Sequence, residues 1–136
     1  MTQSKRKFSG ADYAYRPLAD WNVNHFIAFL AAETKRKFGV DYVPGGRGPI
    51  SSRWAMERGM LKQAQESLGN AVLRRFIERC IANYRPRGDY LFVTFTFMWS
   101  WMRDEVARAQ ADVARSQAKA AREAETVEVT DIDELI

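Results

Sequence analysis

Few side chains in this 136-residue sequence could carry out catalysis. His25 is the only histidine and Cys80 the only cysteine, which excludes zinc sites built from clusters of these residues. His25 has no nucleophile or orienting acid near it in the sequence, so a structural role is favoured over that of a general base. Cys80 lies on the apolar stripe of a predicted helix, which indicates a buried, inert thiol. The acids are scattered without an evident catalytic pair, and we expect no enzyme, no metal and no cofactor.

The glycine-rich segment 45–48 is a candidate phosphate-binding loop. It lacks the Gly-Lys-Ser/Thr ending of a nucleotide-binding loop and the apolar strand that precedes one. We expect a flexible connector instead, in which Arg47 and backbone amides are available to a nucleic-acid phosphate. The run Arg87-Gly88-Asp89 spells the tripeptide of integrin ligands, but no secretion signal accompanies it, and we expect a simple turn.

Clusters of lysine and arginine are the strongest chemical signal in the sequence. Arginine dominates, and its planar guanidinium suits bidentate contact with phosphate. No zinc-finger, RNP or helix-turn-helix signature accompanies the clusters, so we expect phosphate contact with little sequence readout. The residues predicted to contact nucleic acid are Lys35, Arg36, Lys37, Arg47, Arg74, Arg75, Arg79, Arg85, Arg87, Arg108 and Arg115.

Charge is distributed unevenly along the chain. The formal net charge is +4, but residues 1–122 hold all 21 lysines and arginines against 11 acids, whereas residues 123–136 hold six acids and no base. A basic body favours a polyanionic partner, with nucleic acid ahead of an anionic membrane. The acidic end alternates acids with apolar residues, which suits docking into a basic groove with an apolar pocket; the alternative is a solubilising tail.

Apolar spacing predicts an all-α single domain with four main helices. They span about residues 20–38, 52–68, 71–84 and 94–124. Asp20 and either Ser51 or Ser52 are the expected N-caps, and Gly39 is an expected C-cap. Gly59 is expected to weaken the second helix in its middle, so that this helix could consist of two short pieces.

The aromatic segment 90–102 is compatible with two structures. Its aromatic residues alternate as in a strand, which would make 90–97 part of an α+β, winged-helix-like fold. The three- and four-residue spacing of apolar positions continues beyond the segment, however, and favours one long helix that begins near Thr94. On such a helix Trp99 and Trp101 point in different directions, and Trp101 is the one expected to be exposed.

The two ends of the chain are expected to differ from the helical domain at 17–125. Residues 1–16 are polar and basic, and we expect a flexible arm. The residues spaced as a heptad seam on the long helix become small toward its C-terminus, so its second half is expected to protrude or to pair weakly with another chain. Residues 126–136 are expected to form an acidic tail that is disordered when free.

Short aromatic runs recur along about residues 20–105. They are Trp21-Asn22 with Phe26 and Phe29, Phe38-Gly39-Val40-Asp41-Tyr42, Phe76-Ile77, and Phe95 to Met102. In these runs the chain resembles small phage-encoded helical proteins of DNA replication gene clusters, of the helicase-loader and replisome-organiser type. The resemblance implies contact with DNA and a helicase or initiator partner. Because the chain has no ATPase motif, it implies an accessory protein that does not hydrolyse ATP.

Two functional hypotheses follow. The first is a non-enzymatic accessory protein of phage or mobile-element DNA metabolism that binds single- or double-stranded DNA. The alternative is a protein–protein adaptor or inhibitor that acts through the long helix and the aromatic patch. The residues predicted to contact a protein partner are Trp101, Ile132, Leu135 and Ile136. A homo-oligomer through the C-terminal helix is also considered.

The expected location is the cytoplasm, which for a phage-encoded protein is that of the bacterial host. No apolar run approaches the length of a membrane helix, so no contact with a membrane is expected. The charged N-terminal residues are not followed by an apolar segment, so no signal peptide is expected either.

Overall fold

Residues 10–135 are described by a computed structural model, and their side chains over 10–126. Two short 3₁₀ helices, η2 (Ala11–Ala14) and η3 (Leu18–Asp20), come first. Five α-helices follow in this part of the chain: α1 (Val23–Phe38), α2 (Ile50–Leu68), α3 (Asn70–Asn83), α4 (Phe95–Trp101) and α5 (Asp104–Leu135). The described residues contain no strand, so the all-α class is confirmed and the alternative with a strand at 90–97 is wrong.

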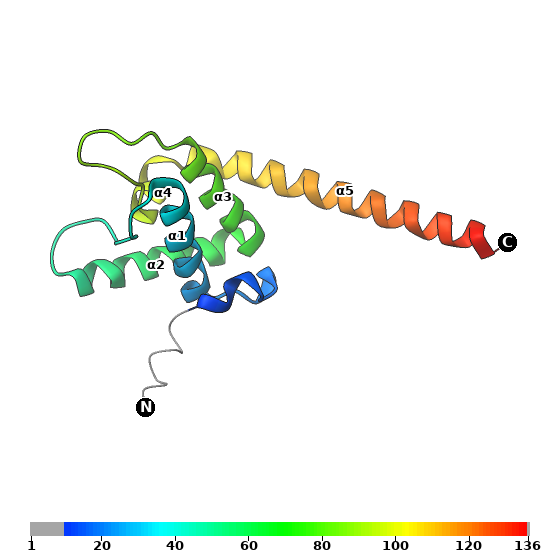
Figure 1. Ribbon diagram of the computed structural model, residues 1–136, viewed down its shortest axis with the longest axis horizontal. Coiled ribbons are helices and arrows are strands. Elements are labelled where there is room, and N and C mark those ends of the chain that lie inside the picture. Colours follow the sequence, from blue (N-terminus) through cyan, green and yellow to red (C-terminus); the bar gives the residue numbers. More distant parts are fainter. Residues whose placement is uncertain (1–9, 136) are drawn as a thin grey trace, which may run out of the picture.

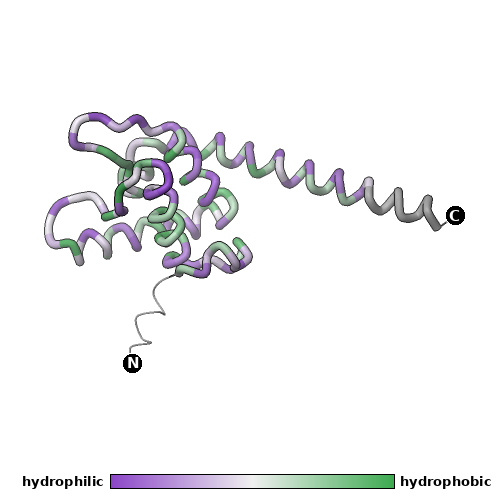
Figure 2. The backbone as a smooth tube through the Cα atoms, viewed as in Figure 1, coloured by the Kyte–Doolittle hydropathy of each residue, from purple (hydrophilic) through white to green (hydrophobic). Residues whose placement is uncertain are grey.

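Helices α1 to α4 pack together into a body, and α5 runs away from it (Figure 1). The apolar stripes of the four helices meet in one core. Residues with no exposed surface come from each of them, including Phe26, Leu61, Phe76 and Phe95. α3 supplies the centre of the core, and its polar side packs along the first turns of α5. Green apolar segments accordingly gather in the body, whereas the coloured part of α5 alternates between purple and green (Figure 2).

The first helix is capped by Asn22 rather than by Asp20, which lies in η3. The Asn22 side chain accepts a hydrogen bond from the backbone N–H of His25 at 3.2 Å, and Nδ1 of His25 accepts one from the backbone N–H of Asn22 at 3.0 Å. This reciprocal capping box satisfies two amides that a helix start otherwise leaves unpaired. The predicted C-cap is confirmed, because Gly39 ends α1 in the left-handed region with φ 75°.

The second helix is longer and more regular than its composition predicts. It begins at Ile50 after Pro49, so neither predicted serine serves as the N-cap. It continues without interruption through Gly59. Buried Leu61 and Ala64 hold its second half against the core, and this packing outweighs the weak helix propensity of the glycine.

The helix predicted over 94–124 consists of two helices. α4 ends at Trp101, Met102 adopts non-helical angles (φ −122°, ψ 28°), and α5 begins at Asp104. The acids in the first turn of α5 are favourable at a helix N-terminus and suit a new start there. The bend lets Trp99 reach the core while Ala109 faces α3. Apolar spacing alone could not reveal it, since the spacing continues across the break.

Both ends of the described chain are more regular than predicted. Residues 10–16 belong to the expected arm, yet η2 packs on α1, with the Tyr13 ring 5.7 Å from that of Trp21 and 6.1 Å from that of Phe29. Residues 1–9 lie outside the described part. At the other end α5 continues to Leu135, through most of the segment predicted to be a disordered tail.

Candidate nucleic-acid interface

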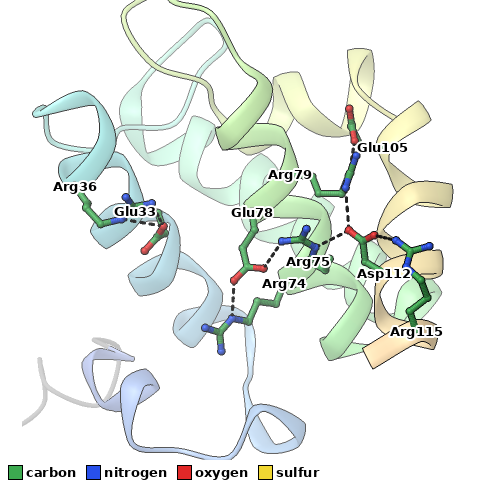
Figure 3. A network of polar contacts seen from close by, with 9 residues as sticks. All are labelled: Glu33, Arg36, Arg74, Arg75, Glu78, Arg79, Glu105, Asp112 and Arg115. Carbon is green, nitrogen blue, oxygen red and sulfur yellow. Dashed lines mark hydrogen bonds and ion pairs between the residues drawn. The ribbon is translucent and has the colours of Figure 1, made fainter. Parts of the chain in front are cut away.

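Arg75 and Arg79, on the polar side of α3, pair with acids of α5 (Figure 3). Nε of Arg75 lies 2.7 Å from Oδ2 of Asp112, and Nη1 of Arg79 lies 2.9 Å from the same atom. Nε of Arg79 also donates to Glu105 at 2.7 Å, and Arg115 pairs with the other oxygen of Asp112. The hydrogen bond from Arg75 is the main reason why the pKa of Asp112 is lowered from its ordinary value. This network joins α3 to α5.

Two further arginines of the predicted interface are also paired. Arg74 donates to Glu78 at 3.3 Å, and its guanidinium lies 5.3 Å from the centre of the Trp21 ring. Arg108 donates to Asp104 at 3.1 Å. The charges of these residues are therefore partly balanced within the fold, so they attract a phosphate less strongly than an arginine with no acid beside it.

The basic cluster at the end of α1 has a structural use. Nζ of Lys37 donates to the backbone carbonyls of Ile81 at 2.7 Å and Ala82 at 2.9 Å, in the last turn of α3. A lysine in this place satisfies carbonyls that the helix itself leaves unpaired. Lys35 and Arg36 each pair with a nearby acid and remain largely exposed.

Arg47, Arg85 and Arg87 differ from the other predicted residues. Their side chains make no ion pair or hydrogen bond within the part of the chain that the structure describes. Arg85 and Arg87 lie in the connection between α3 and α4, and Arg47 in that between α1 and α2. The predicted turn is confirmed: the backbone N–H of Tyr90 donates to the carbonyl of Arg87 at 3.0 Å, and Gly88 has φ 59°.

A groove of about 1030 Å³ lies between this connection and α4, with Gly45 and Gly46 at its edge. The charged side chains in its walls are Arg85 and Arg87, and no described acid lines it. The aromatic residues of its walls are Tyr84, Tyr90, Phe92, Phe97 and Trp101. The groove therefore combines positive charge with aromatic surface.

Three of these aromatic side chains face water. Tyr90 is 73% exposed, Phe97 42% and Trp101 76%. The short helix α4 explains the last two, because its other side buries Met98 and Trp99 in the core. The predicted contrast between Trp99 and Trp101 is thus confirmed. Exposed aromatic rings gathered in one place are typical of a binding surface.

The sequence pointed to only part of this groove. The predicted residues include Arg85 and Arg87 and, for a protein partner, Trp101, but not Tyr90 and Phe97. The position of Tyr90 directly after a glycine turn is a signal that points to it. The other residues predicted for partner contact are not placed by the structure. Ile132 and Leu135 belong to the part of α5 whose side chains the structure does not describe, and Ile136 lies outside the described residues.

The cysteine and the histidine, the two other side chains considered for catalysis, have structural roles. Cys80 is fully buried, and burial raises the pKa of its thiol. Nε2 of His25 lies 3.0 Å from Oδ1 of Asp12, and its other ring nitrogen belongs to the capping box. Across the described residues no three His, Cys, Asp or Glu side chains could together hold a metal ion.

None of the described helices has the length and hydrophobicity of a membrane span.

The groove is where unpaired arginines and exposed aromatic rings occur together. Its geometry follows from the turn at Arg87 and from the short helix α4. Comparison of the chain with protein-family models, curated proteins and solved structures finds no match.

Proposed function

We propose that the protein binds nucleic acid, without catalysis, in the groove between the α3–α4 connection and α4. The observation that carries this proposal is the position of Arg85 and Arg87, unpaired by any described acid, beside exposed Tyr90 and Trp101. Guanidinium groups contact phosphates, and aromatic rings stack on bases whatever the sequence. A groove that offers both suits a strand of nucleotides whose bases are accessible.

The charge of the chain supports the same proposal. Residues 1–122 carry ten more positive than negative charges, so a polyanion is attracted to the body from a distance. Arg47 does not line the groove, but it directly follows Gly46, which does, and its positive charge adds to the attraction. The arginines between α3 and α5 are assigned to the fold, so the proposed interface is smaller than the sequence predicts.

A role in phage or mobile-element DNA replication is part of the proposal. It rests on the resemblance of the aromatic runs to small replication accessory proteins. In that setting the chain would bind DNA and present it to a helicase or an initiator, without hydrolysing ATP.

The groove also favours a second function, the binding of a peptide from a partner protein. Leu91, 54% exposed, adds apolar surface next to Tyr90. A peptide with alternating acidic and apolar residues would satisfy both the arginines and the aromatic rings.

Binding of a labelled single-stranded oligonucleotide of mixed sequence across a salt series tests the proposal. For the wild type we expect affinity that falls steeply with salt, and for Arg85→Ala/Arg87→Ala a slope of log affinity against log salt that is smaller by about 1–2. Trp101→Ala should weaken binding about 5–150-fold with an unchanged slope, since stacking contributes roughly 1–3 kcal/mol per base.

The matched control is Arg36→Ala/Lys62→Ala, which removes two exposed positive charges from α1 and α2 and should leave the slope near that of the wild type. Absence of binding by the wild type at 50 mM salt would refute the proposal and favour the peptide. So would a wild-type slope in the Arg85 and Arg87 variant.

A further inference from the structure

Among the side chains that the structure describes, those in the first turns of helix α5 anchor it to the body. Glu105 and Ala109 are buried there, and Asp112 pairs with arginines of α3. Every side chain from Ala114 to Thr126 is exposed. Figure 1 shows the helix continuing away from the body to its end at Leu135. Most helices owe their stability to a packed face. The described side chains of this extension, residues 114–126, have no such face within the described chain.

The protruding segment, residues 113–135, has two halves of opposite charge. Residues 113–122 contain Arg115, Lys119 and Arg122 and no acid. Residues 123–135 contain six acids and no base. The sign of the charge therefore changes between 122 and 123, next to Ala124 at the midpoint of the segment.

We propose that two copies of this chain associate through residues 113–135 as an antiparallel, two-fold symmetric helix pair. In such a pair the symmetry axis crosses at the midpoint of the shared segment, so the basic half of each helix lies along the acidic half of the other. A parallel pair would place like charges side by side. A second copy thus matches the segment in length, and the basic half of each helix meets the acidic half of the other. Like charges meet only at the axis, where Glu123 of one copy lies opposite Glu125 of the other.

The composition of the segment fits close contact between helices. Alanines at 114, 118, 120, 121 and 124 let two helix axes approach, but they bury little apolar surface. Most of the specificity of the pair therefore comes from charge, and the charges are exposed. We expect weak association, which requires high protein concentration and weakens further as salt screens the pairs.

This inference does not depend on the proposed function. The residues of the segment are separate from those that line the groove, and in Figure 1 the helix leads away from the α3–α4 connection. A pair formed in this way would leave both grooves accessible.

Sedimentation equilibrium of the full chain at 10–200 μM tests the proposal. We expect a monomer–dimer equilibrium at 50 mM salt that shifts at least tenfold toward monomer at 500 mM. Reversal of the basic half (Arg115→Glu/Lys119→Glu/Arg122→Glu) should give a monomer, as should replacement of all six acids of the other half by lysine. An equimolar mixture of these two variants should restore the dimer, which shows that both are folded.

The control Arg47→Glu/Arg85→Glu/Arg87→Glu changes the net charge as much as the basic-half reversal but should leave the dimer intact. Two variants, each with one added cysteine, then show whether the two helices run parallel or antiparallel. The two positions are seven residues apart and lie on the same face of the helix. Ala124→Cys should form an interchain disulfide, whereas Gln117→Cys should not, because its two copies would be about 20 Å apart in the antiparallel pair. A wild-type monomer at 200 μM and 50 mM salt, or equal cross-linking at both positions, would overturn the proposal.

Discussion

Glu57 is a carboxyl group held completely inside the body. It accepts a hydrogen bond from the hydroxyl of Tyr42, and that hydroxyl accepts one from the backbone N–H of Phe95 at 2.9 Å. The other oxygen of Glu57 has no hydrogen-bond partner. Burial raises the pKa of Glu57 to about 7, although the bond from Tyr42 works in the opposite direction. This chain of contacts joins α2 to the α1–α2 connection and to the start of α4, and so helps position the groove.

The buried carboxyl predicts a pH-dependent stability. Its pKa is about 7 in the folded chain against 4.5 as the ordinary value, so between these pH values the folded chain holds a proton that the unfolded chain has lost. The free energy of unfolding should therefore fall as pH rises from 4.5 to 7, by about 3 kcal/mol. Urea unfolding followed by tryptophan fluorescence at pH 5 and pH 8 measures this.

Glu57→Gln should remove most of this fall, because the amide keeps the shape and cannot ionise. At pH 8 the variant should be more stable than the wild type. A pH dependence equal to that of the wild type would show that Glu57 is ionised, or solvated, in the folded chain.

At the scale of the helix, Gly59 is a position where packing of α2 against the core outweighs the low helix propensity of glycine. It is exposed in the middle of α2, and a Cβ placed there would meet no atom within 4 Å. Gly59→Ala should stabilise the protein by about 0.5–1 kcal/mol, because alanine has the higher helix propensity. Thermal unfolding should show a higher midpoint temperature.

The same substitution at Gly10 provides a control of opposite sign. Gly10 has φ 57°, and a Cβ there would lie 2.2 Å from the backbone oxygen of Asn24. Gly10→Ala should therefore destabilise the contact between η2 and α1. Equal effects of the two substitutions would contradict this account of α2.

The contact between α3 and α5 depends on the carboxylate of Asp112. Asp112→Asn keeps its shape but removes the charge shared by Arg75 and Arg79, and should lower the midpoint of thermal unfolding at pH 7. The pKa of Asp112 is lowered below the ordinary 3.8, so its contribution is present above that pH and is lost as pH falls through the lower, folded value. The difference between wild type and variant should thus shrink at pH 2–3. Asp104→Asn removes an exposed pair with Arg108 and one acid of the first turn of α5, so it should lower the midpoint less than Asp112→Asn does. An equal loss in both variants would argue against the network.

The positions of the helices could be predicted from the sequence more readily than the contacts that their polar side chains make. The amphipathic stripe of α3 is visible in the sequence because apolar spacing reports one buried face. The same pattern could not show that Arg75 and Arg79 face α5, since a paired and a solvated arginine have the same sequence signature. The bend at Met102 was hidden for a related reason: both helices keep three- and four-residue spacing, and only the direction of packing changes. The groove forms only where this bend and the turn at Arg87 come together. A pattern of neighbouring residues therefore cannot predict it.

At the scale of the whole molecule, the two proposals together predict bivalent binding. A dimer joined through α5 would carry two grooves, so a long strand could occupy both at once and a short one only one. The basic-half reversal of α5 should therefore bind a short oligonucleotide nearly as the wild type does and lose at least tenfold in affinity for a long one. Fluorescence anisotropy with strands of 10 and 60 nucleotides measures the difference. The variant in which lysines replace the six acids of α5 is then added in equal amount. If dimerisation is the cause, this mixture should recover the affinity for the long strand. A loss that persists in the mixture would mean that Arg115, Lys119 and Arg122 contact the strand themselves.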